Sequence, residues 1–299
     1  MDLERARDLA VEAARAAGRL LSAGTADAFG VHAKGAAGDV VTDLDLASEK
    51  VLVERILTAY PSHAVIAEES GLLGAAGAEW TWLVDPLDGT NNVAIGLPAY
   101  VVGLALCHAG RPVLGVVHDP VTRQTWSAIR GHGALSPSGV RLAPPSRPLP
   151  HGPLLAWTQG YTVTRDDATV LGLKAALELH ARRVLQLWAP LLSWVMLARG
   201  DIDGMVGYRP EAVDLPAGAL IAQEAGMEIR ALDGSPFDEN VNATAADRSF
   251  VAAHPDTLPT LLPLLTPATP EPDPDHPHPG KPPTGNPHEE TPTRGNPGS

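Results

Sequence analysis

The chain of 299 residues contains a single cysteine, Cys107, so no disulfide can form within it. Because free cysteines are usually buried, Cys107 is predicted to be a small residue of the core. No apolar stretch approaches the roughly 20 residues that a membrane-spanning helix needs. The opening residues Met1–Arg5 also lack the apolar region of a signal peptide. These absences predict a cytoplasmic protein.

The chain is also poor in basic residues, with 22 Lys and Arg against 35 Asp and Glu and a net charge of −13 at pH 7. Nucleic acids and anionic membranes bind basic surfaces, so neither is an expected partner. No pair of His or Cys residues has the spacing of zinc ligands. An acidic protein that acts on an anionic phosphate needs metal ions as intermediaries, and here oxygen atoms would hold them.

The length allows one large domain or two, and a Pro-rich segment at 143–153 divides the chain. We predict an N-terminal half, 1–142, that carries most of the metal ligands, and a C-terminal half, 143–265, that completes the active site. The stretch 266–299 is rich in Pro and polar residues and cannot bury a core, so it is predicted to be a disordered tail.

Hydrophobic periodicity predicts helices over 2–23, 45–60, 167–181, 190–199 and 215–225, and strands over 39–42, 64–67, 80–84, 100–108, 113–118, 125–129, 154–158, 183–187 and 203–206. The Gly- and Ala-rich stretch 71–79 is interpreted as a flexible connection. The sequence His118-Asp119-Pro120 at a strand end indicates a turn capped by Asp119 rather than a catalytic His/Asp pair.

The run from Trp82 to Thr90 is the most informative part of the chain. A β-prone segment leads into two carboxylates, Asp85 and Asp88, and a Gly89-Thr90 pair follows at once. Carboxylates at a strand end suit Mg²⁺ or Mn²⁺, and the Gly89 and Thr90 amides can face an anion. A metal site beside an anion cradle predicts phosphate chemistry.

Further acids stand at strand ends or helix starts, namely Asp39, Asp43, Asp45, Glu68, Glu69 and Asp214. Each alone is typical of a helix cap or a partner of the helix dipole. Together, with no cation among them, their carboxylates would repel one another strongly. The set therefore predicts obligatory metal binding.

These motifs resemble the Mg²⁺-dependent, lithium-sensitive inositol monophosphatase-like phosphatases over about residues 30–240. The matching segments are Asp39-Val40-Val41-Thr42 with Asp45, Glu68-Glu69-Ser70, Asp85-Pro86-Leu87-Asp88-Gly89-Thr90 with Asn92, Asp214 with Ala217-Gly218, Glu224-Ala225-Gly226 and Asp233-Gly234. The resemblance implies an α/β (α+β) fold, the layered αβαβα sandwich of the inositol monophosphatase and fructose-1,6-bisphosphatase type. It also implies an active site between the two halves and, commonly, a homodimer.

The resemblance implies two or three Mg²⁺ ions, with Mn²⁺ as the alternative. The implied metal ligands are Glu68, Asp85, Leu87 through its carbonyl, Asp88 and Asp214. Asp85 would bridge two ions, and Asp45 with Thr90 would be the catalytic pair that polarises the attacking water. Gly89 and Thr90, together with Asp88, would contact the substrate.

One segment departs from the family pattern, in which Gly-Ser-Ala-Ala lines the polyol. This chain has Trp188-Ala189-Pro190-Leu191 there, and the indole and the proline would change the pocket and remove a backbone donor. The acid that touches inositol hydroxyls falls near Gly207 by spacing, with Glu211 as the substitute. Trp188 and Glu211 are therefore predicted to bind substrate, unless Trp188 packs inward and the alignment shifts by one or two residues.

The sequence thus predicts a Mg²⁺-dependent phosphomonoesterase, a phosphoric monoester hydrolase, that attacks a small phosphorylated metabolite with metal-activated water. Inositol-1-phosphate is the default substrate by resemblance. Fructose 1,6-bisphosphate, histidinol phosphate and 3′-phosphoadenosine 5′-phosphate are the alternatives. The rivals from other classes are a catalytically degenerate metal- or ligand-binding member and a protein that binds partners through its tail.

Overall fold

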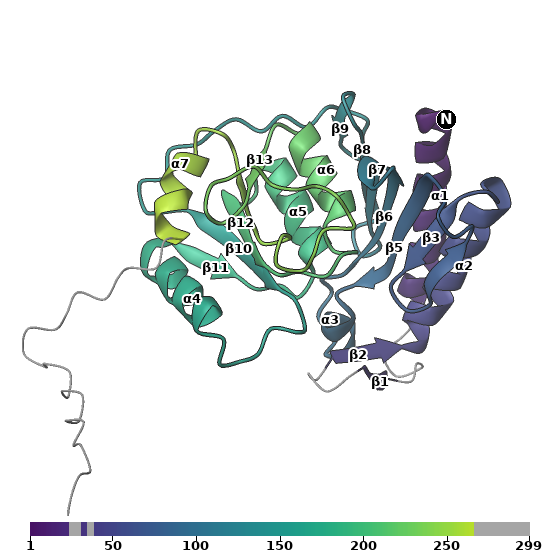
Figure 1. Cartoon of the computed structure of the whole chain (residues 1–299), viewed down its shortest axis with the longest axis horizontal. Coiled ribbons are helices and arrows are strands. Elements are labelled where there is room, and N and C mark those ends of the chain that lie inside the picture. Colours follow the sequence, from purple (N-terminus) through teal and green to yellow (C-terminus); the bar gives the residue numbers. More distant parts are fainter. Residues whose placement is uncertain (24–30, 35–38, 266–299) are drawn as a thin grey trace, which may run out of the picture. The chain divides into compact units, whose positions relative to one another are not determined.

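Two sheets and three helical layers alternate in the computed structural model, which describes residues 1–23, 31–34 and 39–265 (Figure 1). The prediction of a disordered tail concerns residues outside these ranges. The described elements all belong to the compact unit Met1–Pro267. No helix in the described ranges has both the length and the apolar character needed to cross a bilayer.

The first sheet has seven strands in the order β4-β3-β5-β6-β7-β8-β9. Their bounds are β3 (Ala64–Ala67), β4 (Gly71–Gly74), β5 (Trp80–Asp88), β6 (Val101–His108), β7 (Arg111–Asp119), β8 (Gln124–Ile129) and β9 (Gly133–Leu135). Only β3 and β5 pair in parallel, and the other neighbours are antiparallel. The strand that carries the predicted site, β5, therefore lies inside the sheet, where both of its edges are paired.

The second sheet has five strands in the order β11-β10-β12-β14-β13. They are β10 (Leu154–Gln159), β11 (Arg183–Leu185), β12 (Gly204–Tyr208), β13 (Glu228–Arg230) and β14 (Phe250–Ala253). A separate antiparallel pair joins β1 (Val31–Lys34) to β2 (Asp39–Thr42).

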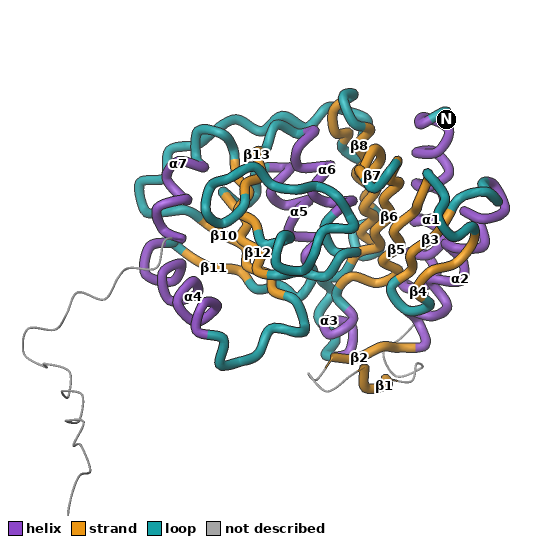
Figure 2. The backbone as a smooth tube through the Cα atoms, viewed as in Figure 1, coloured by secondary structure: helices purple, strands orange, loops and turns teal. Residues whose placement is uncertain are grey.

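The helices fill the three layers around these sheets. Their bounds are α1 (Leu3–Ala23), α2 (Asp43–Ala59), α3 (Thr90–Ala94), α4 (Ala168–His180), α5 (Pro190–Arg199), α6 (Pro216–Glu224) and α7 (Leu258–Leu261), with a 3₁₀ turn at Leu262–Leu265. Helices α1 and α2 cover one face of the first sheet, α5 and α6 lie between the two sheets, and α4 and α7 cover the second sheet (Figure 2). The predicted αβαβα sandwich is confirmed.

The central layer sits unusually close to the first sheet, because glycines face the two inner helices. A Cβ atom on Gly115 of β7 would lie 2.5 Å from the Ala217 carbonyl oxygen in α6, and one on Gly103 of β6 would lie 2.2 Å from Leu191 Cδ1 in α5. A side chain at either position would force the helix away from the sheet. The close approach brings the start of α5 against the end of β5.

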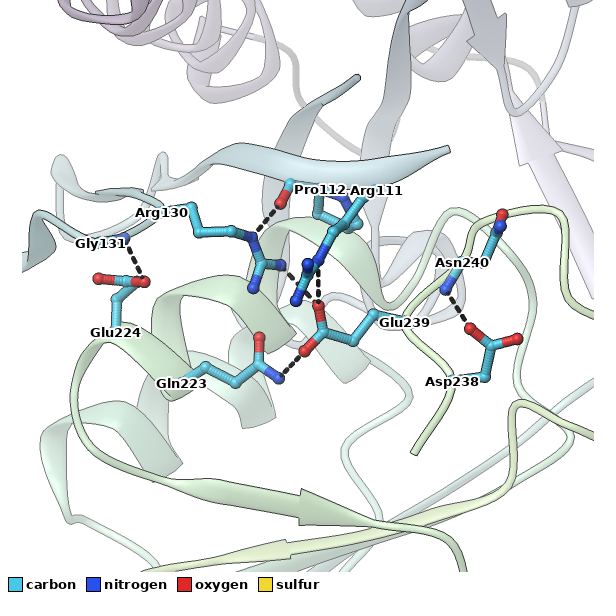
Figure 3. A network of polar contacts seen from close by, with 9 residues as sticks. All are labelled: Arg111, Pro112, Arg130, Gly131, Gln223, Glu224, Asp238, Glu239 and Asn240. Carbon is cyan, nitrogen blue, oxygen red and sulfur yellow. Dashed lines mark hydrogen bonds and ion pairs between the residues drawn. The ribbon is translucent and has the colours of Figure 1, made fainter. Parts of the chain in front are cut away.

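A polar network also joins the first sheet to α6 and to the β13–β14 loop (Figure 3). Glu239 of that loop forms ion pairs with Arg130 at 2.8 Å and Arg111 at 3.5 Å, and it accepts a hydrogen bond from Gln223 of α6 at 2.7 Å. Glu224 of α6 accepts the backbone N–H groups of the β8–β9 turn. The two contacts of Glu224 join segments that lie more than ninety residues apart along the chain.

The elements that were expected from periodicity are present, with differences at strand ends and edges. The stretch 71–79 was predicted to be a flexible connection, and this was wrong, because Gly71–Gly74 forms the edge strand β4 against β3. Cys107 is fully buried, as predicted. The turn capped by Asp119 is confirmed, since its carboxylate accepts the N–H groups of Val121 and Thr122.

Candidate active site

The start of α2 holds the first predicted catalytic residue, Asp45, in a fixed position. Thr42 caps the helix by accepting the Leu44 N–H, and Asp45 Oδ2 accepts the Thr42 N–H at 2.7 Å and the Thr42 hydroxyl at 2.5 Å. This reciprocal capping box satisfies the donors of the first turn. The capping box uses Oδ2 of Asp45 and leaves Oδ1 for a different partner.

That other oxygen meets the second predicted catalytic residue, Thr90. The Thr90 hydroxyl lies 2.7 Å from Asp45 Oδ1 and 2.9 Å from the Leu87 carbonyl oxygen, so its one proton can be donated to either acceptor. Asp45 is fully buried, and burial raises its pKa, while the hydrogen bonds from Thr42 and Thr90 oppose that rise. The structure thus brings Asp45, Thr90 and the predicted metal ligand Leu87 into one hydrogen-bonded group.

The end of β5 departs from regular strand geometry where the two predicted metal-ligating acids lie. Its pairing with β6 shifts register between Asp85 and Asp88, so the strand bulges there, a device common beside active sites. Gly89 follows with φ +104°, and a Cβ atom at that position would lie 2.8 Å from the Ala99 carbonyl oxygen. The turn into α3 therefore requires glycine, and it places Gly89 and Thr90 at the first turn of α3.

Asp88 is buried and is bound by the start of α5. The N–H groups of Leu191 and Leu192 donate to Asp88 Oδ2 at 2.7 and 3.4 Å. Within α5 itself no side chain caps the start, since Ala189 occupies the capping position and Pro190 follows it. Asp88, from another element, thus satisfies the free N–H groups at the start of a helix that begins about one hundred residues later, a role that the sequence did not indicate.

The other predicted metal ligands lie around Asp85. Burial, together with the neighbouring carboxylates of Glu68, Asp88 and Asp214, holds the pKa of Asp85 well above its usual range. Burial and Asp214 likewise raise the pKa of Asp88, against the hydrogen bonds from α5. Four carboxylates from three separate segments of the chain therefore share one electrostatic neighbourhood.

This donor set fits a hard divalent cation in its chemistry, although its side chains are not arranged as a closed ligand shell. Among residues 1–23, 31–34 and 39–265, no three His, Cys, Asp or Glu side chains stand ready to hold a metal ion. Asp88 is directed toward α5, and Glu68 shares a hydrogen bond with Asp85. Carboxylate and carbonyl oxygens are the ligands that Mg²⁺ prefers, and a cation would relieve the repulsion among them.

Two residues of α2 that the sequence analysis did not single out organise the loops of the site. Glu49 is 3% exposed, and its carboxylate accepts the Glu69 N–H at 2.8 Å, the Ser70 N–H at 3.1 Å and the Ser70 hydroxyl. Ser48 donates to the Pro86 carbonyl at 2.8 Å. The sequence feature that could have identified Ser48 and Glu49 is their helical spacing with the buried Asp45, Leu52 and Ile56, which places them on the same face of α2.

A cleft of about 980 Å³ adjoins the acids. It is lined by Asp214, by Asn91, Ala94 and Ile95 of the α3 region, by residues 157–165, and by Gln186, Trp188, Ala189, Pro190 and Ser193. The predicted substrate residue Trp188 lies on this cleft with its side chain 55% exposed, so it does not pack inward.

The predicted acid Glu211 does not line this cleft. Its carboxylate accepts the Tyr161 N–H at 3.3 Å, and so supports the 160–161 backbone. Gly207 is not an acid position either, because a Cβ atom there would lie 2.2 Å from the Phe250 ring. The role of Glu211 as a substitute for the polyol-binding acid stays a prediction.

Comparison with known proteins relates the whole described chain to one family. The model of the inositol monophosphatase family matches residues 2–267. A putative Nus factor SuhB of Neisseria meningitidis serogroup A is 34% identical over 263 residues, which span 86% of this chain and 96% of the relative. The solved suhB protein of Bartonella henselae has a TM-score of 0.78 at 25% identity, covering 87% of this chain and 98% of that chain. A solved inositol monophosphatase of Anabaena (Nostoc) sp. PCC 7120 has a TM-score of 0.73 at 28% identity, covering 89% and 96%.

Proposed function

The chain belongs to the inositol monophosphatase family, and from that premise we propose that it is a Mg²⁺-dependent phosphomonoesterase acting on a small phosphorylated metabolite. The observation that carries the proposal is the gathering of Glu68, Asp85, Asp88 and Asp214 around one buried strand end, beside the hydrogen-bonded Asp45–Thr90 pair. The residues that would hold the metal are Glu68, Asp85, Leu87 through its carbonyl, Asp88 and Asp214.

A bound Mg²⁺ would supply positive charge that lowers the pKa of a water molecule and offsets the charge of the phosphate. The chain's own residues provide the orientation. The Thr90 hydroxyl, which is hydrogen-bonded to Asp45, accepts a hydrogen bond from the attacking water. It can donate its own proton to the buried Asp45 carboxylate. As the water oxygen bonds to phosphorus, the water gives a proton to the Thr90 oxygen and Thr90 gives its own proton to Asp45; the ester P–O bond breaks, and the departing alkoxide takes up a proton from solvent.

The substrate and the assembly are finer parts of the proposal. Inositol-1-phosphate is the default substrate for the family, and the alternatives are fructose 1,6-bisphosphate, histidinol phosphate and 3′-phosphoadenosine 5′-phosphate. A homodimer is the assembly that the family resemblance implies. The relative from Neisseria meningitidis is named a putative Nus factor SuhB, and that name states no catalytic activity. Phosphatase activity of this chain is therefore part of the proposal.

The direct test is phosphate release from these four compounds, with and without Mg²⁺, by the wild type and by Asp85→Asn. We expect Mg²⁺-dependent release from the wild type and a loss of at least about 100-fold in the variant, because a central ligand becomes neutral. Asp119→Asn, which alters an acid that caps a turn at another strand end, should keep its Mg²⁺-dependent turnover.

Thermal unfolding gives a second readout that is independent of turnover. Without metal, Asp85→Asn should have a higher Tm than the wild type, because one of four mutually repelling carboxylates is removed. Mg²⁺ should raise the Tm of the wild type and raise that of the variant much less. Silence across the substrates, in a wild type whose Tm still rises with Mg²⁺, would favour the catalytically degenerate metal-binding member instead.

A further inference from the structure

The large apolar side chains that remain exposed are unevenly distributed in the part of the chain that the structure describes. Eleven are exposed, and only two of them are aromatic: Trp188 at 55% and Tyr161 at 50%. Both line the cleft beside Asp214, and Ile95, which is 68% exposed, lines it as well. Indole and phenol rings are costly to leave in water, so their joint exposure in one cleft indicates a binding surface.

The backbone at Trp188 supports a role beyond packing. Its φ is +53°, a left-handed conformation that is strained for a bulky L-residue. Flanking contacts hold it there: the Leu187 carbonyl accepts the buried Asn92 side chain at 2.6 Å, and the Ala189 carbonyl accepts the Ser193 N–H at 3.1 Å. Trp188 lines the cleft and is 55% exposed, so packing of the ring in the protein core does not account for this conformation.

Two charged residues are among those that line the cleft. Asp214 belongs to the acid cluster and marks the end at which the phosphate would react. Arg165 is exposed and is the one basic residue among those that line the cleft. The predicted polyol partner, Glu211, accepts the Tyr161 N–H and is not among the lining residues, so beyond Asp214 the cleft offers exposed aromatic rings rather than a second carboxylate.

We propose that the alcohol part of the substrate carries a flat aromatic or heteroaromatic ring, which stacks on Trp188 and Tyr161 while its phosphate lies at the acid cluster. This inference rests on the proposed function. It narrows the substrate class from small phosphorylated metabolites in general to phosphate monoesters that carry an aromatic or heteroaromatic ring. Offset stacking of this kind adds about 0.5–1.5 kcal/mol beyond the burial of the same area, which corresponds to about a 2- to 10-fold change in Kd.

Two phosphonates that cannot be hydrolysed test the proposal without relying on turnover. With Mg²⁺ present, calorimetry would compare the Kd of 3-phenylpropylphosphonate with that of its saturated analogue, 3-cyclohexylpropylphosphonate. We expect the wild type to bind the phenyl compound about 2- to 10-fold more tightly. Trp188→Leu should lose this ratio, and Trp188→Phe should keep most of it.

The control is Leu179→Ala on α4, which removes another exposed apolar side chain that does not line the cleft, and it should leave both Kd values unchanged. Equal affinity of the wild type for the two phosphonates, or a ratio that survives Trp188→Leu, would overturn the proposal. Calorimetry measures binding directly and does not depend on turnover. If the protein prefers the phenyl compound but releases no phosphate from any substrate, this inference is supported and the proposed reaction is rejected.

Discussion

Among single residues, Glu49 shows how much of the acid cluster depends on a side chain that binds no ligand itself. It sits one helical turn after Asp45 and accepts three hydrogen bonds, from the backbone N–H groups of Glu69 and Ser70 and from the Ser70 hydroxyl. That turn carries Glu68 toward Asp85. Ionised acceptors make stronger hydrogen bonds than neutral ones, so the charge of Glu49 fixes the position of the turn.

Glu49→Gln should raise the Mg²⁺ concentration that the protein requires, with a smaller effect on the stability of the fold. An amide can accept with one oxygen only, and its NH₂ group would face backbone N–H donors. Loss of a residue that orients a metal ligand typically costs about 10- to 100-fold in metal affinity or activity. The measurement is the Mg²⁺ concentration that gives half-maximal phosphate release.

Glu54→Gln provides the matched control, because Glu54 lies on the same helix and is largely exposed, with only Lys50 at 3.9 Å. Its Mg²⁺ dependence should equal that of the wild type, since exposed pairs of this kind contribute little. Equal Mg²⁺ requirements for Glu49→Gln and Glu54→Gln would contradict the positioning role.

His63 is the residue from which a pH dependence of stability follows. It is 5% exposed, its Nδ1 accepts the Trp82 indole N–H at 3.1 Å, and its ring stacks on Tyr60 at 4.8 Å. Burial lowers the pKa of His63. The unfolded chain, with a His pKa of about 6.5, therefore takes up the proton first as the pH falls.

The stabilising contribution of His63 should thus be complete above about pH 6.5 and should be lost progressively below it. Urea unfolding of the wild type and of His63→Asn between pH 8 and pH 5 would measure it. We expect the difference between their free energies of unfolding to be constant at the upper end and to shrink toward pH 5. His132→Asn, which alters an exposed histidine, should follow the wild type throughout. If the difference between the two free energies of unfolding grows toward pH 5, the expected direction of the pH dependence is wrong.

Among elements, the contact between the first sheet and α6 depends on the β13–β14 loop. Glu239 is the common partner of Arg111, Arg130 and Gln223 there (Figure 3). Its side chain is 23% exposed and that of Arg130 is 25% exposed. When one partner of such a half-buried pair is removed, the other charge remains poorly solvated.

Glu239→Gln should accordingly lower the free energy of unfolding by about 1–2 kcal/mol, measured by urea unfolding at pH 7.5. Asp8→Asn is the control, because it breaks the exposed Arg7–Asp8 pair and should give no measurable change. If both variants unfold at the same urea concentration as the wild type, the network contributes nothing to holding the sheet and α6 together.

The elements also show what the sequence could and could not predict. Long amphipathic helices such as α1 and apolar strands such as β6 follow from periodicity, because packing there agrees with local preference. β4 was missed because glycines begin and end it and its neighbour β3 alone stabilises it. β5 was expected to end at Val84 and continues to Asp88 through a bulge, which is set by pairing with β6 and not by local sequence.

For the whole molecule, the proximity of the acids could be inferred, whereas their hydrogen-bond partners could not. Motifs at strand ends indicated that Asp85, Asp88 and Asp214 would meet. The binding of Asp88 to α5 needs the packing of an inner helix against the first sheet, which depends on Gly103 facing Leu191. Such a contact over about one hundred residues leaves no periodic signal in the sequence, and the same holds for the strained backbone of Trp188.

The capping of α5 by Asp88 has a consequence for a chain as it leaves the ribosome. Synthesis proceeds from the N-terminus, so Asp85 and Asp88 emerge long before Leu191, and Asp214 follows later still. Until then the growing chain contains the strand with its acids but neither the helix that orients Asp88 nor the last carboxylate of the cluster. A chain released early therefore lacks part of the acid cluster, which is complete only when the central layer of the fold has formed.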